Sequence, residues 1–109
     1  MHELAITESV VAAVAERVGP AKVTRVQLLI GKLSGVVPDS VRFCFDVCTE
    51  GTVLAGAQLD IVEIPGRGQC RDCEATVELE DVIALCPCGS ANLQLVGGQE
   101  LRIIEVEVV

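Results

Sequence analysis

The residues with the clearest chemistry are four cysteines that form two short pairs in the second half of the chain. Cys70 and Cys73 have two residues between them, twelve residues follow, and Cys86 and Cys88 have one residue between them. Two cysteine pairs at the tips of neighbouring turns can place four thiolates around a tetrahedral zinc ion. The spacing therefore predicts a structural zinc site formed by Cys70, Cys73, Cys86 and Cys88.

The second pair is one residue shorter than the first. Cys86-Pro87-Cys88 must therefore bend sharply to direct both sulfurs at one metal ion. We expect both sulfurs to bind, because a structural zinc site rarely keeps an open coordination position.

Two other kinds of cysteine chemistry are weaker alternatives. Disulfides belong to oxidising compartments, whereas no basic residue precedes Arg17, so the start of the chain does not resemble a signal peptide. We expect a cytoplasmic protein with reduced cysteines. A thioredoxin-like pair would need Cys70 and Cys73 at the start of a helix that follows a strand, and a second pair nearby favours metal ligation instead.

The two remaining cysteines, Cys44 and Cys48, are four residues apart in a predicted helix. This spacing is compatible with metal ligation, but no further histidine or cysteine accompanies them. Free cysteine is among the most frequently buried residue types. We therefore expect both to be core thiols.

His2 is the sole histidine and lies next to the chain terminus. The α-amine of Met1, the amide nitrogen of His2 and its imidazole can close five- and six-membered chelate rings on one cation. Such nitrogen-rich, tetragonal sites suit nickel(II) or copper(II). A fourth donor could be the Glu3 amide, a carboxylate such as Glu3 or Asp39, a thiolate, water or another protein. On local chemistry alone, a surface histidine without a metal is the more common case.

Two helices are predicted to position these residues. Helical spacing predicts a helix from Leu4 to Val18, ended by Gly19-Pro20. A second helix is predicted to begin at Pro38 and to end before Thr49. The apolar face of the first helix contains Leu4, Val11, Val14 and Val18, and that of the second contains Val41, Cys44, Phe45 and Cys48.

Three strands are predicted, at residues 23–30, 59–64 and 101–108. Glycines mark both ends of segment 65–98, which contains the four paired cysteines. A segment shorter than about 40 residues usually needs a metal, disulfides or a partner in order to fold. We expect an α+β fold, in which a small three-stranded sheet with two helices (1–64 and 99–109) carries an inserted four-cysteine, zinc-ribbon-like module (65–98).

Charge and motifs exclude several function classes. The chain has 8 Lys and Arg residues against 16 Asp and Glu residues, a formal net charge of −8. Without a basic cluster, nucleic acid and anionic membranes are poor partners, and no segment reaches the roughly 18 apolar residues of a membrane span. No serine–histidine–carboxylate set or glycine-rich phosphate loop is present. We therefore do not expect an enzyme.

Taken together, these motifs resemble the hydrogenase nickel-incorporation family HypA/HybF over essentially the whole chain. The similarity rests on Met1-His2-Glu3-Leu4 at the start of a helix, on the two cysteine pairs before an acidic strand, and on two internal segments. These segments are Ile30-Gly31-Lys32-Leu33-Ser34 and Phe43-Cys44-Phe45-Asp46.

The resemblance implies a nickel metallochaperone that acts in the maturation of nickel-iron hydrogenase and, in some organisms, of urease. Its implied partners are a nickel-handling GTPase of the HypB type and the hydrogenase large subunit. His2, with Met1 and Glu3, would carry nickel, and the four paired cysteines would hold structural zinc. The chain departs from the family in its shorter second cysteine pair. It also lacks the additional histidine that some relatives place near the zinc module.

Two rival functions share these features. One is a zinc-ribbon protein-interaction adaptor without a nickel function, in which His2 is incidental. The other is a thiol oxidoreductase that uses Cys70 and Cys73. Metal stoichiometry separates them, because an adaptor holds one zinc ion, a chaperone binds nickel as well, and an oxidoreductase needs neither.

Overall fold

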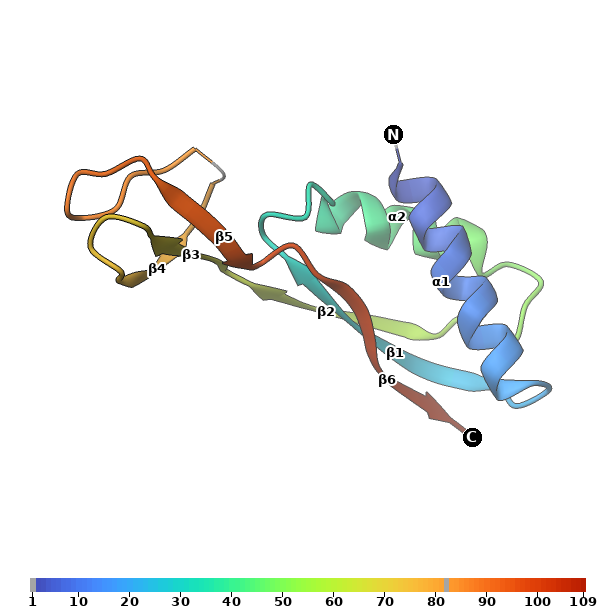
Figure 1. The fold of residues 1–109 in the computed structure, drawn as a ribbon. Coiled ribbons are helices and arrows are strands. Elements are labelled where there is room, and N and C mark those ends of the chain that lie inside the picture. Colours follow the sequence, from blue (N-terminus) through green and yellow to red (C-terminus); the bar gives the residue numbers. More distant parts are fainter. Residues whose placement is uncertain (1, 82) are drawn as a thin grey trace.

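Two helices and two three-stranded sheets form the described part of the chain in a computed structural model that covers residues 2–81 and 83–109. The molecule is elongated, with extents of 53 × 25 × 17 Å. Figure 1 shows both helices over one face of the larger sheet, with the smaller sheet at the opposite end of the molecule. The predicted α+β class is confirmed.

Helices α1 (Glu3–Val18) and α2 (Pro38–Cys48) lie where the sequence predicts them. Gly19 ends α1 with a positive φ of 61°, and its N–H donates to the carbonyl of Ala15. Pro38 begins α2, because proline lacks the N–H that a first helical turn cannot pair. In the described residues, neither helix has the length and apolar character that crossing a bilayer requires.

The larger sheet has the strand order β2-β1-β6. It contains the three predicted strands, β1 (Val23–Gly31), β2 (Gln58–Ile64) and β6 (Leu101–Val108). β1 and β2 are parallel, and α2 lies in the crossover connection that such a pair needs. β6 pairs with β1 in the antiparallel direction, which places the end of β6 beside the start of β1.

The core lies between this sheet and the helices. Val26, Leu28 and Ile30 point from β1 toward the helices and are at most 1% exposed. They belong to one cluster with Val14 of α1 and Phe45 of α2. Burial of these side chains is the main stabilising contribution in this half of the molecule.

One position on α1 differs from the prediction. Leu4 was expected on the apolar face but is 42% exposed, whereas Thr7 is 1% exposed. Thr7 can be buried because its hydroxyl donates to the carbonyl of Glu3 at 2.7 Å, which satisfies the polar group within the helix. The buried face of α1 therefore begins with two polar residues, Glu3 and Thr7, and leaves Leu4 in solvent.

The smaller sheet has the strand order β4-β3-β5, with both pairings antiparallel. Its strands are β3 (Gly66–Cys70), β4 (Thr76–Leu79) and β5 (Leu93–Gly97). Among the described residues from 65 to 98, the buried hydrophobic side chains are Cys70, Leu79 and Cys86. So small an apolar core supports the expectation that this part needs a metal to fold.

Backbone contacts join the two sheets. The N–H of Gly31 donates to Glu100 at 2.8 Å, and the N–H of Leu33 donates to Gly98 at 2.7 Å. A Cβ on Gly98 would lie 2.3 Å from the Cα of Gly66, so only glycine fits this crossing. The predicted module boundaries, residues 65 and 98, fall at this junction. Independent folding of the two parts stays a prediction.

Candidate metal centres

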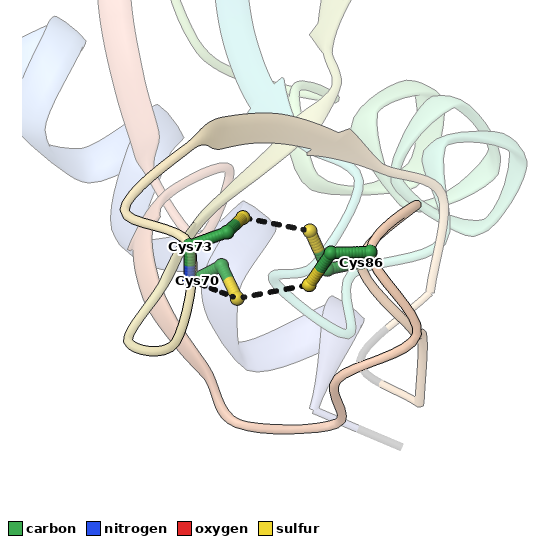
Figure 2. Close-up of side chains that lie close together, drawn as sticks. Cys70, Cys73 and Cys86 are labelled. Atoms are coloured by element: carbon green, nitrogen blue, oxygen red, sulfur yellow. Dashed lines mark hydrogen bonds between the residues drawn. The ribbon is translucent and has the colours of Figure 1, made fainter.

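The structure brings the four predicted zinc cysteines together at the end of the smaller sheet. Their sulfur atoms all lie within 4.8 Å of one another. The Sγ atoms of Cys70 and Cys88 are 3.7 Å apart, and those of Cys73 and Cys86 are 3.6 Å apart. Figure 2 shows the side chains of Cys70 and Cys73 facing that of Cys86. The four thiols thus form one cluster.

The sulfur separations match a tetrahedral metal site. Four sulfurs at about 2.3 Å from one zinc ion are about 3.8 Å from each other. A disulfide would require about 2.05 Å, so the distances of 3.6 and 3.7 Å describe free thiols that surround a common point. The donor set therefore fits zinc.

A tight turn positions the first cysteine pair. Cys70 ends β3, and its carbonyl accepts the N–H of Glu74 at 2.9 Å. Glu74 has a positive φ of 65°, which reverses the chain toward β4. The N–H of Cys73 points at the Sγ of Cys70 at 3.5 Å. This turn directs both sulfurs of the pair to the same side.

A second turn gives Cys86-Pro87-Cys88 the sharp bend that its short spacing requires. The N–H of Gly89 donates to the carbonyl of Cys86 at 2.7 Å, and Gly89 has a φ of 94°. The hydroxyl of Ser90 donates to the carboxylate of Asp72, which links this turn to the first one. Both sulfurs of the shorter pair therefore reach the cluster.

The environment of the cluster favours ionisation of one cysteine thiol but opposes ionisation of all four. The backbone N–H of Cys73 is the main cause that lowers the pKa of Cys70 to about 6. The N–H of Cys88 acts to lower the pKa of Cys86, but burial and the neighbouring thiols outweigh it and raise this pKa to about 12. Four thiolates can share this space only when a cation compensates their charge.

The geometry disfavours the thioredoxin-like alternative. In the described part of the chain, a turn and then β4 follow Cys73, where that chemistry needs the start of a helix. Cys44 and Cys48 are half-buried on α2, and Cys48 packs against the core. Burial is the main cause that raises the pKa of Cys48. The core-thiol prediction is therefore right for Cys48 and only partly right for Cys44.

Two of the predicted nickel residues, His2 and Glu3, lie at the start of α1. Figure 1 shows the start of α1 near the middle of the long axis of the molecule, with the smaller sheet at one end. His2 is exposed, and its carbonyl accepts the N–H of Ile6 at 2.9 Å. With Ile6 and Arg102 it borders an open hollow of about 430 Å³ between α1 and β6. Met1, the third predicted donor residue, lies outside the described residues.

The carboxylate of Glu3 is already occupied by a structural contact. Glu3 is 8% exposed, and its Oε2 accepts the backbone N–H of Val37 at 3.3 Å. Its own backbone N–H and then that of Val37 lower the pKa of Glu3. The carboxylate of Asp39 accepts a hydrogen bond from Arg42 at 2.8 Å. Of the two carboxylates considered as a fourth donor, that of Glu3 is therefore buried and hydrogen-bonded, whereas that of Asp39 is exposed.

Comparison with known proteins decides the family. The model of the family described as "Hydrogenase/urease nickel incorporation, metallochaperone, hypA" matches residues 1–108. The chain belongs to the HypA family. Hydrogenase maturation factor HypA of Nostoc punctiforme is 54% identical over 108 residues, which are 99% of this chain and 96% of that protein. HypA of Trichormus variabilis is 55% identical over the same shares of the two chains.

Solved HypA structures share the fold. The solution structure of the nickel metallochaperone HypA from Helicobacter pylori has a TM-score of 0.66 at 25% identity and covers 100% of this chain and 98% of its own. A second HypA solution structure has a TM-score of 0.68 at 27% identity, with coverage of 100% and 97%. Membership of the HypA family confirms the resemblance inferred from the sequence. The function of this family is nickel incorporation in hydrogenase maturation.

Proposed function

We propose that this HypA-family protein binds one nickel(II) ion at its N-terminus and delivers it during the maturation of nickel-iron hydrogenase, with urease as a further candidate client. The observation that carries the proposal is the exposed His2 at the first position before α1. His2 supplies its imidazole and amide nitrogens, and Met1 and the amide of Glu3 supply the remaining nitrogens.

The start of a helix suits this kind of donor set. The first N–H groups of a helix have no backbone acceptor within the helix, so the amide of His2 is available to a metal, and the amide of Glu3 becomes available when it gives up the contact with its own carboxylate. A coordinated amide must lose its proton and becomes an anion. The positive end of the helix dipole stabilises an anion at this place. The same positive field would disfavour a cation that binds without displacing amide protons. The site therefore favours metals that can displace them, such as nickel(II) and copper(II).

Zinc has a separate and structural role in this proposal. The four-thiolate cluster fits tetrahedral zinc and leaves no open position, whereas nickel(II) prefers a tetragonal set rich in nitrogen. The closed cluster stabilises residues 65–98, and the exposed chain end carries the ion that is transferred. The protein is thus a metal carrier and not a catalyst.

Delivery needs partners that accept the ion. The proposed partners are a nickel-handling GTPase of the HypB type and the hydrogenase large subunit, in the cytoplasm. An ion held by exposed nitrogens at a chain end can exchange ligands with an approaching protein without opening a buried site. The formal net charge of −8 supports protein partners with basic surfaces and disfavours nucleic acid.

The test is calorimetric titration of the untagged, zinc-loaded protein with nickel(II). His2→Ala should abolish nickel binding while the zinc content and the melting temperature stay at the wild-type values, because the exposed His2 contributes little to the core. A variant with one extra residue before Met1 tests the α-amine as a donor. Equal nickel affinity in wild type and His2→Ala would instead favour a zinc-ribbon adaptor without a nickel function.

A further inference from the structure

An apolar groove runs along the outer side of the two helices. At one end it is a hollow of about 460 Å³ that Leu4 of α1 borders together with Phe43, Cys44 and Val47 of α2. A second hollow of about 490 Å³ continues it past Glu8 and shares Leu4 and Val47 with the first. We call this continuous surface the α1–α2 groove.

The side chains of the groove are unusually apolar for an exposed surface. Phe43 is 73% exposed, Val47 is 53% exposed and Leu4 is 42% exposed. The chain has two phenylalanines, and the other, Phe45, is 2% exposed in the core. Adjacent exposed apolar side chains of this size mark an interaction site rather than ordinary surface.

The groove starts at the proposed nickel terminus. Glu3, which directly follows His2, borders its first hollow. Metal transfer by ligand exchange requires donor atoms of the receiving protein to reach the ion, so that protein must cover the surface around residues 2 and 3. The α1–α2 groove is an apolar surface that directly adjoins Glu3.

Shape and charge indicate what occupies the groove. A furrow between two neighbouring helices accepts a third helix through its apolar face. Acidic residues border the furrow, with Glu3 and Asp39 at its first hollow and Glu8 at its second. Within the described residues, Asp39 pairs with Arg42 at 2.8 Å, whereas the ion pairs of the structure do not involve Glu8. Basic side chains beside the apolar face of an incoming helix would complement them.

We propose that the α1–α2 groove is the docking site for an amphipathic helix with basic flanks on the nickel-receiving protein. The inference rests on the proposed function, since it assigns the surface through which the metal carrier meets its recipient. Phe43 and Val47 are the apolar anchors, and Glu8 provides electrostatic attraction. Docking there brings the recipient to the chain end that holds the ion.

The test measures binding of the purified nickel-handling GTPase to the zinc-loaded protein by calorimetry. The combined Phe43→Ser and Val47→Ser variant should weaken this complex by about tenfold or more, as expected for the loss of apolar anchors. The matched control is Ile83→Ser, because Ile83 is 88% exposed on the distant module. Phe43→Ser alone is the second variant should the combined one be unstable.

A charge-reversal variant distinguishes specific docking at this site from nonspecific apolar contact. Glu8→Lys should weaken the complex and reduce its dependence on salt concentration, because it removes an attraction that salt screens. Unchanged affinity in the serine variants, or an equal loss in Ile83→Ser, would overturn the assignment. So would a concentration-dependent dimer of the wild type that Phe43→Ser abolishes, because a second copy of this chain would then occupy the groove.

Nickel titration of the same variants keeps the two proposals distinct. The groove variants should bind nickel with wild-type affinity, because their side chains supply no donor atom. If His2→Ala leaves nickel binding intact while Phe43→Ser weakens the GTPase complex, the nickel proposal fails and the docking surface stands. If His2→Ala abolishes nickel binding and Phe43→Ser leaves the complex unchanged, the docking proposal fails alone.

Discussion

The carboxylate of Glu3 accepts a hydrogen bond from the backbone N–H of Val37 at 3.3 Å, which ties the beginning of α1 to the beginning of α2. Val37 directly precedes α2, so this N–H belongs to the helix end where donors lack intrahelical acceptors. A negative charge at this place is favourable for both helix dipoles. Glu3 thereby holds the proposed nickel terminus and the first hollow of the groove in one arrangement.

Glu3→Ala is expected to lower the melting temperature of the protein and to weaken nickel binding less than His2→Ala does. The first effect follows from the lost cap on α2, and the second from the loss of a fixed position for the chain end rather than of a donor atom. Thermal unfolding and nickel titration measure the two effects. Glu8→Ala, an exposed change on the same helix, is the control, and equal melting temperatures in both variants would contradict the capping role.

Removal of one cluster thiol should unfold the module and spare the larger sheet. Cys73→Ala leaves three thiols in a segment with little apolar core, so residues 65–98 lose the metal that stabilises them. Structural zinc in peptides of this kind is worth about 10–16 kcal/mol.

Hydrogen exchange should show the loss of amide protection in β3 and β5 and retained protection in β1 and α1. Cys44→Ala is the matched control and should keep one zinc ion per chain. Tight zinc and native protection in Cys73→Ala would show that the cluster is not the source of the module's stability.

The larger sheet and both helices were predictable because their patterns are long and regular. Val26, Leu28 and Ile30 alternate along β1 as a half-buried strand requires, and Gly19-Pro20 is a strong signal for a helix end. The smaller sheet left no such pattern. Its strands have four or five residues, and β3 reads Gly-Arg-Gly-Gln-Cys, so its pairing depends on the cysteine turns rather than on hydrophobic alternation.

The contacts at the candidate sites also differ in whether the sequence alone predicts them. The cysteine cluster was predictable because metal geometry imposes spacing on the sequence itself. The contact between Glu3 and Val37 was not, since it joins residues 34 positions apart and depends on how two helices pack. The exposure of Leu4 was missed because Thr7 takes the core position, and its internal hydrogen bond is visible only in the folded helix.

An acid-sensitive contact crosses the open face of the larger sheet. Arg25 contacts Asp60, and it pairs with Glu105 and Glu107 at 2.9 Å each. The hydrogen bond from Arg25 is the main cause that lowers the pKa of Asp60, with Gln58 contributing. A pKa lowered in the folded state means that ionised Asp60 stabilises the fold. This stability is fully present above the usual carboxyl pKa and is lost as the pH falls through the lowered one.

Asp60→Asn should therefore lower the free energy of unfolding at pH 7, with a difference from wild type that shrinks as the pH drops below the usual pKa of 3.8. Urea unfolding at a series of pH values measures this difference. Asp46→Asn on the exposed side of α2 removes one charge without removing this contact, and it serves as the control. A difference that grows toward low pH would have the wrong sign for the proposed linkage.

The junction between the two sheets should tolerate no side chain at Gly98. This residue has a φ of +95°, and a Cβ would meet the Cα of Gly66 at 2.3 Å and the carbonyl oxygen of Pro65 at 2.9 Å. Gly98→Ala thus combines backbone strain with a clash against backbone atoms that cannot rotate away. Gly56→Ala separates the two effects, since Gly56 has a similar φ of +77° and an added Cβ there would meet no atom within 4 Å. We expect Gly56→Ala to destabilise the fold by about 1 kcal/mol and Gly98→Ala to destabilise it clearly more, because the crossing must widen.

Urea unfolding of both variants measures the difference in stability. Hydrogen exchange should show that Gly98→Ala loses amide protection mainly at Leu33, whose N–H donates to the Gly98 carbonyl. Equal destabilisation by the two substitutions would mean that the crossing is loose and that the two sheets are joined by chain connectivity alone.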